Sequence, residues 1–170
     1  MSKRAFKKYL KSLKKKDLED QLTDLYERFP EVKTFYDFVF NPQEEKLVRE
    51  AKAKISKEYF PKNRRKAKGR RSVAHKYIRH FLKLEMEPHA LADLMLYNIE
   101  IAQAFAEEKD KITPAFEKSM FNSFEQATEF IISNGIVSEF AERIHRITEA
   151  TLRQNWGISY KFEKLNDRFL

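Results

Sequence analysis

The sequence contains no cysteine, only three glycines and only five prolines among 170 residues. Without cysteine there is no disulfide, thiolate metal site or cysteine nucleophile, and we expect a cytoplasmic protein. So few glycines argue against a β-protein, a phosphate-binding loop and a dinucleotide-binding fingerprint. No apolar run approaches the roughly 20 residues of a transmembrane helix, so we expect no membrane span.

Helical periodicity is the strongest pattern that the sequence does contain. Phe6, Tyr9, Leu10 and Leu13 recur at the spacing of one helix face, and comparable stripes follow along the chain. Residues 89–106 are apolar almost all round the helix axis, which indicates a central, buried helix. The patterns predict an all-α protein, an irregular bundle or short helical stack of about seven to eight helices.

The helix start and stop signals and the breaks between apolar stripes predict one domain over residues 1–170. Residues 61–71 are rich in lysine and arginine without an apolar period, so we expect a mobile basic loop there. The tail at 157–170 is ambiguous. Thr113-Pro114 and Asn134-Gly135 are start and stop signals for a helix between them.

The positive charge is concentrated in two segments. Residues 1–16 hold 8 Lys or Arg and residues 62–83 hold 10, both without an acid, although the whole chain has 26 acids and a net charge of +8. Such segments attract phosphate backbones by Coulomb steering and counterion release. The alternative is that they are ordinary solvated surface, paired in part with the acidic remainder.

The leading hypothesis is a non-enzymatic binding or adaptor module whose basic surface engages an acidic protein or a nucleic acid. The candidate binding residues are Arg64, Arg65, Lys66, Lys68, Arg70 and Arg71, supported by Lys7, Lys8, Lys11 and Lys14. His75, Tyr77, Arg79 and His80 follow the loop and could stack on unpaired bases. No recognised nucleic-acid motif accompanies them, and the sequence does not determine the oligomeric state.

The first predicted helix has a second interpretation. Lysines opposite a stripe of Phe6, Tyr9, Leu10 and Leu13 also describe a helix that lies on a membrane surface. In the commoner arrangement the stripe packs on the core and the lysines face water.

Three polar residues share one face of the apolar segment 89–106: Asp93, Tyr97 and Glu100. Buried carboxylates must pair or take up a proton, because an isolated buried charge is costly. Paired carboxylates can serve as acid and base. The structural interpretation, which we favour, is that Arg71, Arg79 or a neighbouring lysine supplies the counter-charge.

The runner-up function is a small metal-dependent or carboxylate-based helical enzyme that uses Asp93, Glu100, His89 or His145. His89 and Asp93 are four residues apart and could reach one metal ion. Glu142 and His145 match the Glu-x-x-His pair of di-iron bundles, but those sites need a second such pair and none is present. We therefore predict no catalytic residue, metal site or cofactor.

Five segments resemble a family of short, all-helical bacterial proteins known only as a domain of unknown function. They are residues 7–13, 25–29, 37–42, 54–60 and 96–102. The resemblance implies one domain and a bacterial cytoplasmic protein. It implies no activity and no site residues.

Overall fold

The computed structural model describes residues 2–62 and 66–169, and every regular element within them is a helix. The helices are α1 (Lys3–Ser12), α2 (Lys15–Arg28), α3 (Pro30–Phe40), α4 (Glu44–Tyr59), α5 (Arg71–Lys83), α6 (Pro88–Glu107), α7 (Pro114–Ser133), α8 (Val137–Arg153), α9 (Ser159–Asn166) and the 3₁₀ helix η1 (Asp167–Phe169). The all-α prediction is confirmed. The predicted number of helices is too low, because the ambiguous tail forms α9 and η1.

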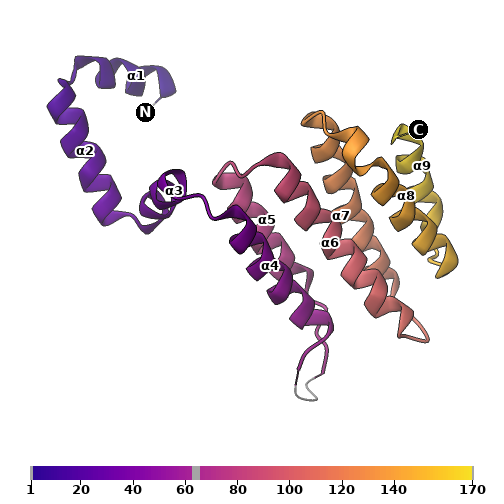
Figure 1. Cartoon of the computed structure of the whole chain (residues 1–170). Coiled ribbons are helices and arrows are strands. Elements are labelled where there is room, and N and C mark those ends of the chain that lie inside the picture. Colours follow the sequence, from indigo (N-terminus) through magenta and orange to yellow (C-terminus); the bar gives the residue numbers. More distant parts are fainter. Residues whose placement is uncertain (1, 63–65, 170) are drawn as a thin grey trace. The chain divides into compact units, whose positions relative to one another are not determined.

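The chain divides into two compact units, Met1–Gln43 and Glu44–Leu170. The first unit contains α1 to α3 and the second contains α4 to η1 (Figure 1). The prediction of a single domain over the whole chain stays a prediction. In the described part of the chain, no helix is long and apolar enough to cross a membrane.

The first unit has no buried core of its own. None of the described residues of α1, α2 and α3 is buried, and the stripe on α1 leaves Phe6 48% and Tyr9 45% exposed. Polar contacts connect its helices instead: Gln21 donates to the Tyr9 hydroxyl at 2.8 Å, and the Tyr26 hydroxyl donates to Asp37 at 2.7 Å.

The second unit is built around α6, as the apolar segment 89–106 predicts. This helix contacts α4, α5, α7 and α8, and ten of its twenty residues are buried. Figure 1 shows the helices of this unit standing in a row, with α4 and α5 at one end and α9 at the other. The prediction of a central sixth helix is confirmed.

A continuous row of aromatic rings, some buried and some partly buried, runs through the second unit. Ring centroids lie 5.6 Å apart for Tyr59 and Phe105, 6.4 Å for Phe105 and Phe116, and 5.9 Å for Phe116 and Trp156. Trp156 then contacts Phe162 at 5.8 Å. Edge-on and tilted ring contacts of this kind add to the stabilisation that apolar burial provides. The row connects α4, α6 and α7 to the C-terminal helix.

The predicted helix signals are found where the sequence places them. Pro114 stands at the start of α7, and the Thr113 hydroxyl caps this helix by accepting from the Phe116 N–H at 3.2 Å. Gly135 follows α7 with φ +70°, a left-handed conformation that favours glycine. Local sequence therefore determines both ends of α7.

Candidate binding surface

The connection between α4 and α5 carries five of the ten predicted binding residues. Its described residues, 60–62 and 66–70, are not helical. Arg64 and Arg65, two of the predicted residues, lie outside the described residues. Arg71, which the sequence interpretation assigned to the loop, is the first residue of α5.

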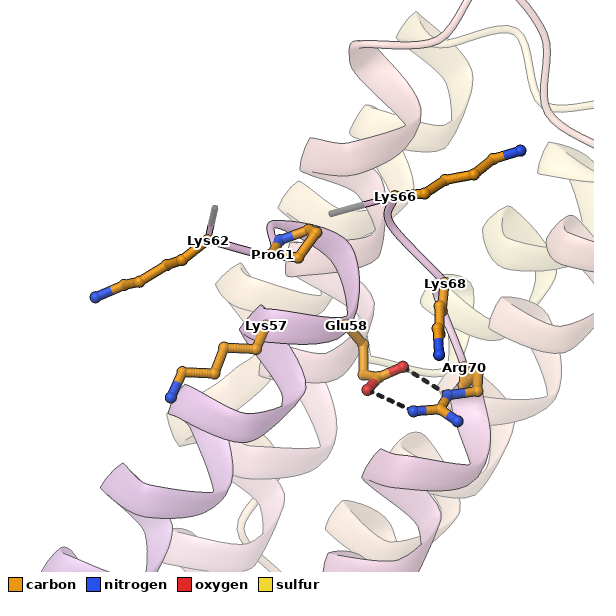
Figure 2. Close-up of a pocket in the computed structure, with 7 residues that line it drawn as sticks. All are labelled: Lys57, Glu58, Pro61, Lys62, Lys66, Lys68 and Arg70. Carbon is orange, nitrogen blue, oxygen red and sulfur yellow. Dashed lines mark hydrogen bonds and ion pairs between the residues drawn. The ribbon is translucent and has the colours of Figure 1, made fainter. Parts of the chain in front are cut away.

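The end of this connection is anchored to the last turn of α4. The backbone N–H groups of Lys68 and Gly69 donate to the Glu58 carbonyl at 2.9 and 3.0 Å. The Arg70 guanidinium donates to both carboxylate oxygens of Glu58, at 2.8 and 3.0 Å (Figure 2). A bidentate pair of this kind fixes both partners in one geometry. Glu58 therefore joins the connection to α4 through its backbone and its side chain.

The pair with Arg70 also determines the ionisation of Glu58. Hydrogen bonds from Arg70 hold the pKa of the Glu58 carboxyl below its ordinary value, against the opposing effect of partial burial. The same contacts raise the pKa of Arg70. The two side chains thus stay ionised and neutralise each other.

Gly69 allows the chain to approach α4 closely. Its φ is +54°, and a Cβ at this position would meet the edge of the Tyr59 ring at 3.5 Å. Backbone in this conformation strains a residue with a side chain. The glycine therefore suits both the turn and the contact with the buried ring.

A basic recess of about 460 Å³ lies beside this anchor. It is lined by Lys57, Glu58, Pro61, Lys62, Lys66, Lys68 and Arg70. In Figure 2 the side chains of Lys57 and Lys62 extend to one side of the connection and that of Lys66 extends to the other. We call the four exposed lysines of this recess, Lys57, Lys62, Lys66 and Lys68, the α4–α5 basic surface.

Within the described residues, none of these four lysines makes a salt bridge. Among the described residues that line the recess, Glu58 is the only one with a carboxylate, and it is paired with Arg70. The surface therefore presents positive charge to solvent.

Arg71 does not belong to this exposed surface. It is partly buried, and its Nε donates to the Ser123 hydroxyl on α7 at 3.1 Å. Burial lowers the pKa of this guanidinium, although Tyr59 opposes the change. The residue thus faces the interior of the second unit.

The supporting residues Lys7, Lys8, Lys11 and Lys14 lie in the first unit, and all four are exposed. The first three are on α1, which has no acidic residue in its first turn and no buried residue. These lysines form a second basic region, which belongs to the first unit.

The predicted polar face of α6 is an ion network. Arg143, from α8, donates to Asp93 at 2.7 Å and to both carboxylate oxygens of Glu100 at 2.6 and 2.7 Å. Lys52, from α4, contacts Asp93 at 2.6 Å and lies 5.0 Å from the centroid of the Tyr97 ring. We call Lys52, Asp93, Glu100 and Arg143 the Arg143 network. It connects three helices.

The sequence interpretation anticipated this pairing but named the wrong arginines. Arg71 contacts Ser123, and Arg79 donates to the backbone carbonyl of His75 at 3.4 Å. The signal for Arg143 was present, because the residue lies three positions after buried Phe140 and four before buried Ile147. Its side chain therefore shares the inward face of α8.

The network also determines the charge of Asp93. Partial burial acts to raise the pKa of this carboxyl, but hydrogen bonds from Lys52 and Arg143 outweigh burial and lower it. The same hydrogen bonds raise the pKa of Arg143 against the effect of its own burial. Asp93 is thus an ionised, hydrogen-bonded carboxylate.

The histidines named as metal candidates have local partners. His89 Nε2 lies 3.5 Å from Glu139, and His145 lies 3.3 Å from Glu149 and 3.2 Å from Asn166. Among the described residues, no three His, Cys, Asp or Glu side chains are grouped to hold a metal ion.

The described residues thus form an all-helical protein with an exposed lysine surface on the second unit and an ion network between α4, α6 and α8. Over residues 1–170 the chain matches the family described as "Family of unknown function (DUF6155)", and it belongs to that family. Searches of curated proteins and of solved structures found no match.

Proposed function

We propose that this chain is a non-enzymatic binding module whose α4–α5 basic surface engages a polyanion, with nucleic acid as the favoured ligand and an acidic protein as the alternative. The observation that carries the proposal is the set of four exposed lysines around one recess whose only carboxylate is already paired with Arg70. A cytoplasmic location, as expected from the sequence, is compatible with either ligand.

The geometry favours contacts to a phosphate backbone over contacts to bases. Lysine is a hydrated point charge on a flexible stem, and it binds phosphates without requiring one orientation. The residues that line the recess include no aromatic side chain on which a base could stack. Phosphate contacts position a protein on nucleic acid but do not read sequence. We therefore expect binding with little sequence preference.

The Arg143 network supports a binding module over the alternative enzyme. Asp93 and Glu100 are held by Arg143, and Asp93 is also held by Lys52. A carboxylate such as that of Asp93, which is ionised and hydrogen-bonded by two charged donors, is a poor general acid. Their connections to α4 and α8 favour a structural role.

Fluorescence anisotropy with labelled single- and double-stranded oligonucleotides across a salt titration tests the proposal. If all four lysines contact phosphates, binding to duplex should weaken by about 100-fold between 50 and 200 mM salt. Substitution of Lys57, Lys62, Lys66 and Lys68 by Gln should remove most of the binding at low salt.

A matched control replaces four other exposed lysines of the second unit, Lys46, Lys111, Lys118 and Lys164, by Gln. This variant has the same net charge and should retain most of the affinity. Equal losses in both variants would contradict a local surface. If neither oligonucleotide binds at low salt but polyglutamate does, the partner is an acidic protein. A further variant at Lys7, Lys8, Lys11 and Lys14 measures the contribution of the first unit.

A further inference from the structure

A buried hydroxyl without a partner lies next to the start of α5. Tyr59 is only 2% exposed, and its hydroxyl has no hydrogen-bond partner among the described residues. Its ring packs between Phe105, at 5.6 Å between centroids, and Gly69, whose Cβ position is 3.5 Å from the ring edge. Buried polar atoms are nearly always hydrogen-bonded, so this hydroxyl requires an explanation.

A partly buried cation stands two residues after Gly69. Arg71 makes no salt bridge within the described part of the chain, and the Ser123 hydroxyl is the group it contacts. A guanidinium has five N–H donors, and one hydroxyl satisfies only a small part of them. Arg71 and Tyr59 influence each other's pKa, which agrees with their being neighbours.

His75 adds a third group one turn further along α5. Its Nε2 atom is buried and has no partner among the described residues. Burial and the nearby cations Arg71 and Arg79 lower the pKa of this imidazole, so it is neutral at neutral pH. In one of its two tautomers, Nε2 carries a proton that it can donate.

The N-terminus of α5 adds further positive charge and further hydrogen-bond donors. No side chain caps the N-terminus of the 13-residue helix α5, and its first turn contains no acid. The N-terminus of a helix carries a partial positive charge and free N–H groups. These features are donors or positive charges, and the carboxylate whose charge acts on Tyr59, that of Glu58, is already paired with Arg70.

We propose that Tyr59, Arg71 and His75, called the Arg71 cluster below, bind one small oxyanion, either free or as the end group of a larger ligand. Arg71 supplies the charge, and the hydroxyl and imidazole donate hydrogen bonds. Because Arg71 and His75 keep part of their surface exposed, the ion enters from their side. Phosphate and carboxylate groups share this chemistry. The inference does not depend on the α4–α5 basic surface, which is made of different residues.

Thermal unfolding of the whole chain in sodium phosphate, sodium acetate and sodium chloride at equal ionic strength tests the proposal. At an anion concentration about 100 times Kd, phosphate or acetate should raise the Tm by about 5–10 °C over chloride. Phosphate also stabilises folded proteins in general by exclusion from their surface. A rise with phosphate alone that is lost in Arg71→Gln therefore identifies a phosphate group, and a rise with acetate alone that is lost in Arg71→Gln identifies a carboxylate. No rise with either anion would overturn the proposal.

Tyr59→Phe is the decisive variant, because it removes only the hydroxyl. In chloride its Tm should equal or exceed that of the wild type, since loss of an unpartnered buried hydroxyl is neutral or favourable. The rise caused by the anion should fall by at least half. Tyr160→Phe, at a tyrosine that is 61% exposed, is the control and should retain the full rise. A clearly lower Tm of Tyr59→Phe in chloride would show that the hydroxyl already has a partner and would overturn the proposal.

Arg71→Gln and Lys76→Gln separate a specific site from general charge. Both remove one positive charge from α5, but Lys76 is exposed. Arg71→Gln should abolish the rise and Lys76→Gln should preserve it. Equal losses would mean that the anion is adventitious only. The four-lysine variant of the α4–α5 basic surface should also keep the rise, so failure of one proposal is distinguishable from failure of the other.

Discussion

Replacement of Arg143 by Ala is the most direct test of how the second unit is held together. This side chain is only 19% exposed, and it connects Asp93 and Glu100 of α6 to α8. Removing it leaves two carboxylates of α6 without their shared cation. The loss of one partner from a fully buried ion pair costs about 3–5 kcal/mol.

The expected cost here is smaller, for two reasons. The side chains of Asp93 and Glu100 keep 27% and 36% of their surface exposed, so water compensates part of the lost interaction. Lys52 also remains beside Asp93, at 2.6 Å. We therefore expect a loss of about 2–3 kcal/mol in the free energy of unfolding. For a protein of this size, that loss lowers the Tm by about 5–10 °C.

Far-UV circular dichroism and the fluorescence of Trp156, the only tryptophan, both follow the unfolding. Trp156 is 2% exposed, so its emission reports the core of the second unit. Arg146→Ala is the matched control on the same helix, because Arg146 is 65% exposed and pairs with Glu142 on the surface at 3.4 Å. This change should cost less than about 1 kcal/mol. Equal losses in the two variants would refute a stabilising role for the network.

Two further predictions concern acid and backbone conformation. The pKa of Asp93 is lowered by its partners, so its contribution to stability is complete above about pH 4, the ordinary aspartate value, and is lost as the pH falls through the lower folded-state value. The Tm of Asp93→Asn should thus depend less on pH than that of the wild type in an acid titration, and parallel curves would contradict this. Gly135→Ala should cost about 1–2 kcal/mol in urea unfolding, because φ is +70° there, whereas Gly157→Ala, without a positive φ, should cost much less. Similar costs at both positions would disprove the conformational argument.

Much of the fold could be predicted because the relevant information is local. Stripes at helical spacing mark the faces of the helices, and Thr113 and Gly135 mark the ends of α7. The apolar segment 89–106 could bury all its sides only in the middle of a bundle, which is where α6 lies. The short tail escaped prediction because a few turns give too weak a period.

The burial of each positively charged side chain could not be predicted from the sequence in the same way. Arg71 follows a run of basic residues and was assigned to the exposed surface, but it faces Ser123 on another helix. Arg143 is surrounded in sequence by other charges and was not considered, although it lies on the inward face of α8. The sequence gives the residue type and the helix face of each arginine. The residues that Arg143 and Arg71 contact lie 43 to 52 positions away along the chain, on other helices. The buried hydroxyl of Tyr59 is equally invisible in the pattern, where it is one more aromatic residue in a stripe.

Three arginines of the second unit hold their guanidinium groups in fixed positions. The guanidinium groups of Arg70, Arg71 and Arg143 each donate through Nε to a side-chain oxygen. A guanidinium is planar and weakly hydrated, so a fixed position suits it. An ammonium is strongly hydrated and is more often found at the surface, although Lys52 of the Arg143 network is partly buried. The charge that an approaching partner meets at the α4–α5 basic surface is therefore lysine charge. Lysines respond to the charge density of a polyanion and not to its detailed shape. Under the proposed function, the α4–α5 basic surface therefore supplies affinity, and the proposed Arg71 cluster would supply the selection of one defined anionic group.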